Sequence, residues 1–148
     1  MTLNEILVHL GQDLDTTLSL NKEGKCAFTF KETIDVYLED NFDNKDFNAK
    51  CEICELQDSI NPIFYEILLE THLLGQGTNG CLFGISKNSK KIILFKNFIN
   101  DESDYDSFLY DLQGLIKTSI AFQEKLFDIY RTEVARVHTV APLKSIKI

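Results

Sequence analysis

Hydrophobic positions recur along this chain with two different periods, and the change of period predicts where helices and strands lie. Apolar residues three and four apart predict a first helix from Leu3 to about Leu14, and Thr2 with Glu5 matches a capping box at its start. The same spacing predicts a central helix over 61–74, where Asn61 and Pro62 form a favourable start. A long third helix is predicted from the acidic stretch at 101–104 to about Phe127.

Six segments are predicted to be strands. Lys25–Lys31 and Thr33–Glu39 alternate with a period of two, and the other four are Thr17–Leu20, Ala49–Leu56, Cys81–Ser86 and Lys91–Phe98. The polar stretch Asp40–Asn48 is predicted to be a loop whose Phe42 and Phe47 pack back onto the core. Within the last strand, residues 92–95 are all apolar, so both of its faces need cover.

The resulting order of elements is α-β-β-β-β-α-β-β-α, which predicts an α+β fold with three helices packed on a twisted, mainly antiparallel sheet. A chain of 148 residues is long enough for one domain but not for two, and we expect that domain to occupy residues 1–130. Residues 131–148 form a basic C-terminal extension, expected to continue the third helix and then fray into a partly disordered end.

Charge excludes several functions. A net charge of −8 and a pI near 4.8 argue against nucleic acid and against an anionic membrane surface as partners, because both attract clustered Lys and Arg. We find neither a signal-peptide pattern nor an apolar run of about 18 residues, which predicts no membrane insertion and a cytoplasmic protein with reduced cysteines.

Residues that could bind a metal ion or take part in catalysis are few and scattered. Cys51 and Cys54 form a single CxxC pair on a predicted strand, without the second pair that a zinc site requires and without the helix N-terminus of a redox site. His9, His72 and His138 have no neighbouring nucleophile. We therefore expect no catalytic residue, no cofactor, no metal site and no enzymatic activity.

A glycine-rich stretch joins the central helix to the next strand and reads Leu-Leu-Gly-Gln-Gly-Thr-Asn-Gly over residues 73–80. It follows the C-terminus of a helix, whereas a phosphate loop precedes an N-terminus, so a structural turn is favoured. This stretch resembles the LLGQGTGG signature of class I type III secretion chaperones, the small effector chaperones typified by the Tir chaperone. Asn79 stands where that family often has Gly, and the resemblance extends over the order of elements from Leu3 to about Leu126.

The resemblance implies a homodimer that binds the N-terminal chaperone-binding segment of one or more secreted effectors in extended form and keeps it soluble and secretion-competent. It also implies a place in the cytosol of a Gram-negative bacterium and presentation of the effector to the secretion-system ATPase, without ATP hydrolysis by the chaperone. The pattern itself indicates surplus apolar surface on the central helix and on the strands. Such surface suits a twofold dimer and the addition of an extended peptide to a sheet edge.

The resemblance also implies which residues of this sequence form the two binding surfaces. The dimer interface is expected on the central helix, at Phe64, Ile67, Leu68, His72 and Leu74. The effector-binding surface is expected on the first helix and the strands, at Val8, Phe28, Phe30, Val36, Ile93 and Phe95.

Two other functions remain open at this point. An adaptor would bind a folded partner tightly and would be indifferent to unfolded segments. A small enzyme would have a polar pocket with converging carboxylates or histidines.

Overall fold

The computed structural model describes residues 1–42, 45–56, 62–102 and 104–147, and its side chains extend to Thr132 apart from residue 130. Three α-helices, one short 3-10 helix and five strands follow one another along these residues. In chain order they are α1 (Leu3–Asp13), β1 (Lys25–Phe30), β2 (Ile34–Asn41), β3 (Asp46–Glu55), α2 (Ile63–His72), η1 (Leu73–Gly75), β4 (Leu82–Ser86), β5 (Lys91–Ile99) and α3 (Tyr105–Lys147).

The strands form one antiparallel sheet in the order β1-β2-β3-β5-β4. The two longest strands, β3 and β5, are neighbours near its middle, and a bulge between Glu52 and Cys54 shifts their register. Strand β5 therefore has a neighbouring strand along each edge, but no described helix covers its face with Ile93 and Phe95, so the cover expected for both faces is found on one only.

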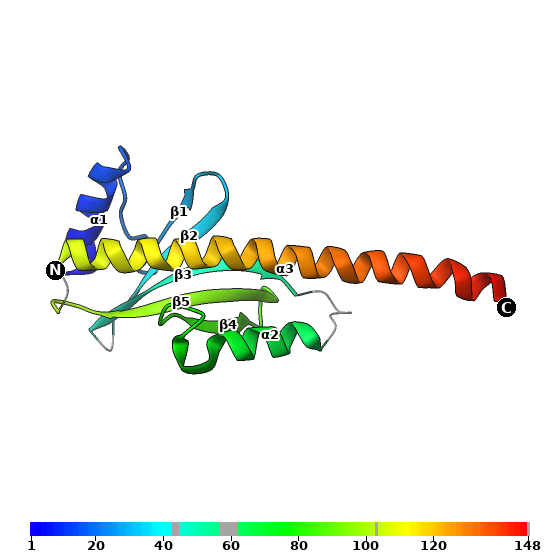
Figure 1. Ribbon diagram of the computed structural model, residues 1–148. Helices are drawn as coiled ribbons and strands as arrows, with labels where there is room; N and C mark the ends of the chain where they lie inside the picture. Colours follow the sequence, from blue (N-terminus) through cyan, green and yellow to red (C-terminus); the bar gives the residue numbers. More distant parts are fainter. Residues whose placement is uncertain (43–44, 57–61, 103, 148) are drawn as a thin grey trace.

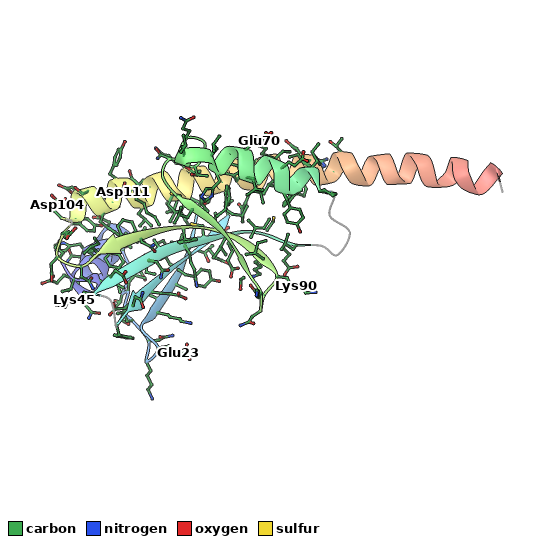
Figure 2. All side chains as sticks on the ribbon, turned by 90° about the horizontal axis from the view of Figure 1, so that it is seen from below. Glu23, Lys45, Glu70, Lys90, Asp104 and Asp111 are labelled. Atoms are coloured by element: carbon green, nitrogen blue, oxygen red, sulfur yellow. The ribbon has the colours of Figure 1, made fainter. Side chains whose placement is uncertain are left out.

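The helices lie on one side of the sheet (Figures 1 and 2). Helix α3 crosses β3, and Phe108 on α3 is fully buried against Phe47 of β3 and Phe98 of β5, with ring centroids 5.8 and 5.1 Å away. Helix α1 closes one end of this core through Leu3, Ile6, Leu7 and Leu10. On the opposite side of the sheet, no described helix covers the strands.

The start of α1 is the capping box that the sequence predicts. The Thr2 amide donates to Glu5 Oε2 at 2.7 Å, and the Glu5 amide donates back to Thr2 Oγ1 at 3.4 Å. The Thr2 amide, together with the Thr2 hydroxyl that donates to the same Glu5 Oε2 at 3.1 Å, lowers the pKa of the Glu5 carboxyl, since both donors stabilise its charged form. Helix α2 begins at Ile63, two residues after the predicted Asn61, which lies outside the described residues, and Pro62 is in the N-cap position.

The predicted fold class is confirmed, and two details of it are wrong. Residues 17–20 form no strand, because their polar positions face solvent and only Leu18 and Leu20 pack against the core. The predicted loop 40–48 is shorter, since β2 continues to Asn41 and β3 begins at Asp46. Phe47 thus belongs to a strand and stacks on Phe98 at 5.1 Å, whereas Phe42 is 69% exposed.

Residues 131–147 continue α3 without a break. A helix of 43 residues is about 65 Å long, whereas the ten-residue β3 spans about 34 Å. The C-terminal part of α3 therefore projects beyond the sheet (Figure 1). The division of the chain at residue 130 stays a prediction.

Candidate protein-binding surfaces

The glycine-rich turn between α2 and β4 holds its shape through backbone geometry. Leu74, Gly75 and Gly80 have φ of 54°, 68° and 79°, in the left-handed region. Thr78 is fully buried and its hydroxyl donates to the carbonyl of Cys81 at 2.6 Å. The turn is therefore structural, as its position after a helix predicts.

Gly77 in this turn should be the least replaceable glycine. A Cβ at Gly77 would lie 2.5 Å from Thr71 Cγ2 and 2.7 Å from the Thr71 carbonyl oxygen, so alanine must displace the end of α2. We expect Gly77→Ala to lower the free energy of unfolding by about 2 kcal/mol in denaturant titrations. Gly80→Ala is the matched control, because a Cβ there meets nothing within 4 Å and costs only about 1 kcal/mol for its positive φ. Equal losses in both variants would contradict this account of the turn.

A cluster of leucines is exposed where α2 ends. Tyr65, Leu69 and Leu73 follow one another at intervals of four residues, so they share one face of the helix, and Leu69 and Leu73 are 73% and 66% exposed. Leu74 adds a side chain that is 85% exposed, held outward by its left-handed backbone. A non-glycine residue in this conformation costs about 1 kcal/mol. We call Leu69, Leu73 and Leu74 the leucine cluster.

Four of the five residues predicted for a dimer interface lie on the inward side of α2, and the fifth, Leu74, lies in η1. Phe64 and Leu68 are 6% and 7% exposed and belong to the core of the single chain, and Ile67 is half-buried. His72 is also half-buried, and its Nδ1 accepts a hydrogen bond from the amide of Phe83 on β4 at 3.2 Å. Leu74 alone of the five is open to a partner over most of its surface.

The sequence does not single out Leu69 and Leu73, which the structure shows to be exposed. Both belong to the apolar pattern of α2, which has two stripes, one with Phe64 and Leu68 and one with Tyr65, Leu69 and Leu73. The spacing within the second stripe was visible in the sequence. Periodicity cannot say which stripe faces the core, because that depends on where α2 packs against β4.

The residues predicted for effector binding do not form one surface. Val8 is 58% exposed on the outer side of α1. Phe28 and Phe30 are half-buried on β1, an edge strand, on the face of the sheet that carries the helices. Val36 is paired with Phe28, but it is fully buried, so a client reaches it only if the sheet opens.

Ile93 and Phe95 lie on the opposite, uncovered face of the sheet. They alternate along β5 with the buried Ile92 and Leu94 and remain half-buried. Both side chains lie over Gly84 of β4, since a Cβ built there would be 3.4 Å from Ile93 and 3.5 Å from Phe95. The ring of Phe95 and the aliphatic side chain of Ile93 thus cover the backbone of Gly84, which has no side chain of its own.

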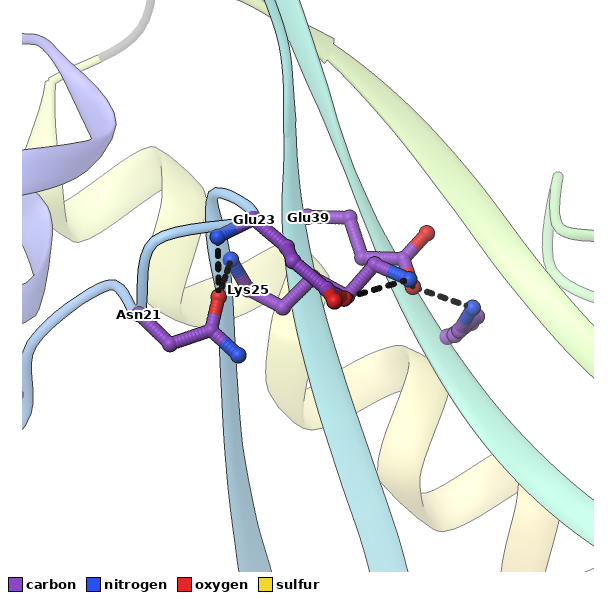
Figure 3. Close-up of polar contacts among 5 residues, drawn as sticks. Asn21, Glu23, Lys25 and Glu39 are labelled. Atoms are coloured by element: carbon purple, nitrogen blue, oxygen red, sulfur yellow. Dashed lines mark hydrogen bonds and ion pairs between the residues drawn. The ribbon is translucent and has the colours of Figure 1, made fainter.

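Ion pairs occupy the rest of this uncovered face. Lys50 Nζ lies 2.6 Å from Glu39 Oε1, and Lys91 Nζ lies 2.6 Å from Glu52 Oε2, which raises the pKa of Lys91. Lys25 lies 3.7 Å from the same oxygen of Glu39 (Figure 3). Asn21 supports this corner because its Oδ1 accepts from the amides of Glu23 and Lys25 at 2.9 and 3.0 Å (Figure 3). The paired charges lie beside an apolar group on the same face, formed by Ile93, Phe95 and Leu82, the cross-strand partner of Phe95.

The cysteines lie in apolar surroundings. Burial raises the pKa of the Cys51 and Cys54 thiols to about 11, so both are protonated at neutral pH and poor nucleophiles. All four cysteines are free, and within the described part of the chain no three His, Cys, Asp or Glu residues come close enough to hold a metal ion. Among the described helices, none has the length and hydropathy to cross a membrane.

The domain has helices on one face of its sheet and an exposed leucine cluster beside the glycine-rich turn, and its cysteines are unreactive. These features suit a small domain that binds polypeptides. The sequence profile of the Tir chaperone protein (CesT) family matches residues 5–123. The chain belongs to this family. The resemblance to effector chaperones is thereby confirmed, and the function class of the chain is that of a type III secretion chaperone.

Solved structures share the fold. The chain is similar to a protein of the ExsC–ExsE complex, with a TM-score of 0.73 and 18% identity over 85% of this chain and 97% of that chain. It is similar to a chain of the HopA1–SchA chaperone–effector complex, with a TM-score of 0.68 and 14% identity over 81% and 91%. It is also similar to a chain of the Yersinia pestis type III secretion chaperone SycH in complex with a stable fragment of YscM2, with a TM-score of 0.61 and 16% identity over 82% and 99%. Comparison with curated protein sequences gives no significant match.

Proposed function

We propose that this chain is a chaperone that binds the N-terminal chaperone-binding segment of one or more secreted effectors in extended form and keeps it soluble and secretion-competent. The observation that carries the proposal is the family match over residues 5–123. The structures of similar fold support it, because two of them are described as a chaperone–effector complex and as a secretion chaperone with a bound fragment.

The working form of the protein is a homodimer, with the leucine cluster at its twofold contact. Leu69 at the end of α2 and Leu73 and Leu74 of η1 are 73%, 66% and 85% exposed, which leaves three large apolar side chains open to a partner. Small oligomers are most often twofold dimers, in which one patch meets its own copy. Burial of these side chains in a second subunit offsets the strained backbone of Leu74.

An extended client fits the open parts of the sheet. The edge strand β1 presents Phe28 and Phe30, and the uncovered face presents Ile93 and Phe95, so a client segment meets different apolar residues as it passes from one to the other. Ordering an unfolded segment costs several kcal/mol, and a long contact path offsets that cost better than one pocket. The two pairs of residues are thus successive contacts, not one binding site.

The remaining parts of the proposal follow from family membership. The protein works in the cytosol without a cofactor, has no catalytic activity of its own and presents the bound effector to the secretion-system ATPase. It inserts into no membrane and binds no nucleic acid, consistent with its net charge of −8.

Refolding of an aggregation-prone effector tests the function. We expect the protein to suppress aggregation, followed by light scattering, when an effector with its N-terminal segment is diluted from denaturant. The same effector without that segment is the matched control and should aggregate as fast as in buffer alone. Protection of neither, together with tight binding to the folded effector, would favour an adaptor instead.

A further inference from the structure

The net charge of the chain is concentrated in two segments. Residues 1–21 and 97–116 contain eight Asp and Glu residues and no Lys or Arg. Since the chain has 23 acidic residues and 15 Lys and Arg, the acidic residues elsewhere equal the basic ones in number. The two segments therefore account for the whole net charge of −8.

The fold brings these two segments together at one end of the molecule. Helix α1 lies beside the start of α3, whereas the other end of α3 lies far away (Figure 1). The hydroxyl of Tyr105 on α3 donates to Asp13 Oδ2 at 2.5 Å, and the ring of His9 lies 5.2 Å from the Tyr105 ring. Seven of the eight carboxylates are exposed, and we call them the acidic end: Glu5, Asp13, Asp15, Asp101, Glu102, Asp104 and Asp106.

Helix capping explains only part of this charge. Glu5 caps α1, and Asp104 caps α3 by accepting from the amide of Ser107 at 2.8 Å. Asp111, the half-buried eighth, pairs with Lys96 at 2.7 Å. The N-terminal ammonium lies 3.8 Å from Asp101 and compensates one further carboxylate. Gathering the remaining ones with no Lys or Arg in either segment costs electrostatic free energy, which a cationic partner would recover.

Exposed apolar side chains stand on the same two helices. Val8 on α1 is 58% exposed and Tyr110 on α3 is 75% exposed. Neither side chain belongs to the core, to which α1 contributes Leu7 and α3 contributes Phe108. An unpartnered helix surface with apolar side chains among carboxylates is complementary to a segment that alternates basic and apolar residues.

We infer that the acidic end docks a basic, apolar-containing stretch of the client polypeptide. This inference rests on the proposed function and adds a chemical class for the client. The carboxylates steer the segment toward the chaperone and set its register, while Val8 supplies an apolar contact. Because most of the charges are exposed, the attraction weakens as salt shortens the screening length.

Peptide binding with charge-matched variants tests the inference. The probes are a labelled 24-residue peptide of Lys, Val and Ser and its counterpart with Glu in place of Lys, measured by fluorescence anisotropy at low salt. In the test variant D15N/E102Q/D106N, three exposed carboxylates of the acidic end become amides without loss of a cap. The control variant E32Q/E55Q/E124Q removes the same charge from exposed positions elsewhere.

We expect the basic peptide to bind and the acidic one not to bind. The test variant should raise the Kd for the basic peptide about five- to tenfold, as three weak surface attractions allow, and the control variant less than twofold. Equal effects of the two variants, equal binding of the two peptides, or no binding of the basic peptide would overturn the inference. Suppression of effector aggregation is measured separately, so the proposed function stands or fails independently of this result.

Discussion

Leu73→Asp should leave the protein folded but convert it from a dimer to a monomer. Leu73 is 66% exposed in the single chain, so the aspartate of a monomer remains in water and the fold loses little. In a dimer the same carboxylates would be buried against apolar partners at the twofold contact, which costs several kcal/mol for each uncompensated charge. We expect the mass from light scattering to fall from twice the 17.0 kDa of the chain to that value.

Two further variants make this result specific. Val8→Asp places the same charge at a similarly exposed position on α1 and should leave the dimer intact. Leu68→Asp places it in the core of the single chain, where Leu68 is 7% exposed, and should unfold the protein instead of only splitting it. A Leu73→Asp protein that keeps its dimeric mass would move the interface away from the leucine cluster.

Phe108→Ala should cost more stability than any exposed substitution on α3. Phe108 is fully buried where α3 crosses the sheet, and its ring packs against Phe47 and Phe98. Truncation of a phenylalanine in such a place costs about 3–5 kcal/mol, since it removes aromatic contacts and leaves a cavity. The measurement is the free energy of unfolding in urea at one fixed protein concentration, because a dimer's stability depends on concentration.

Tyr110→Ala is the control on the same helix. Tyr110 is two residues away and 75% exposed, so its loss should change the free energy of unfolding by less than about 0.5 kcal/mol. If both variants lost the same stability, α3 would not pack on the sheet through the face that contains Phe108.

The fold class could be predicted because local patterns agree with the global fold. The capping box of Thr2 and Glu5 marks the start of α1, alternation marks β1 and β2, a continuous apolar run marks β5, and the glycine-rich turn marks the end of α2. The pattern of residues 17–20 wrongly predicts a strand because short apolar and polar alternation also occurs in connections whose alternate side chains pack against a core. Phe47 was assigned to a loop because the surrounding Asp and Asn residues favour turns, and its stacking on Phe98 outweighs that preference.

The binding surfaces were harder to predict than the fold. Alternation shows that Ile93 and Phe95 share one face of their strand and that Phe28 and Phe30 share one face of theirs, but it does not show whether Val36 lies with the latter pair or that the two faces are opposite. Which side chains share a face of the sheet depends on the strand order β1-β2-β3-β5-β4 and on the bulge between Glu52 and Cys54. The local spacing of residues encodes neither the strand order nor the bulge. Concentration of the charge was visible in the sequence, yet only the packing of α1 beside α3 places the acidic residues together.

The most direct test of the account is the mass of the protein in solution, alone and with a synthetic N-terminal segment of a candidate effector. The account predicts a dimer of 17.0 kDa chains that binds the unfolded segment and gains its mass. A protein that is monomeric at micromolar concentration and gains no mass with any effector segment would contradict it.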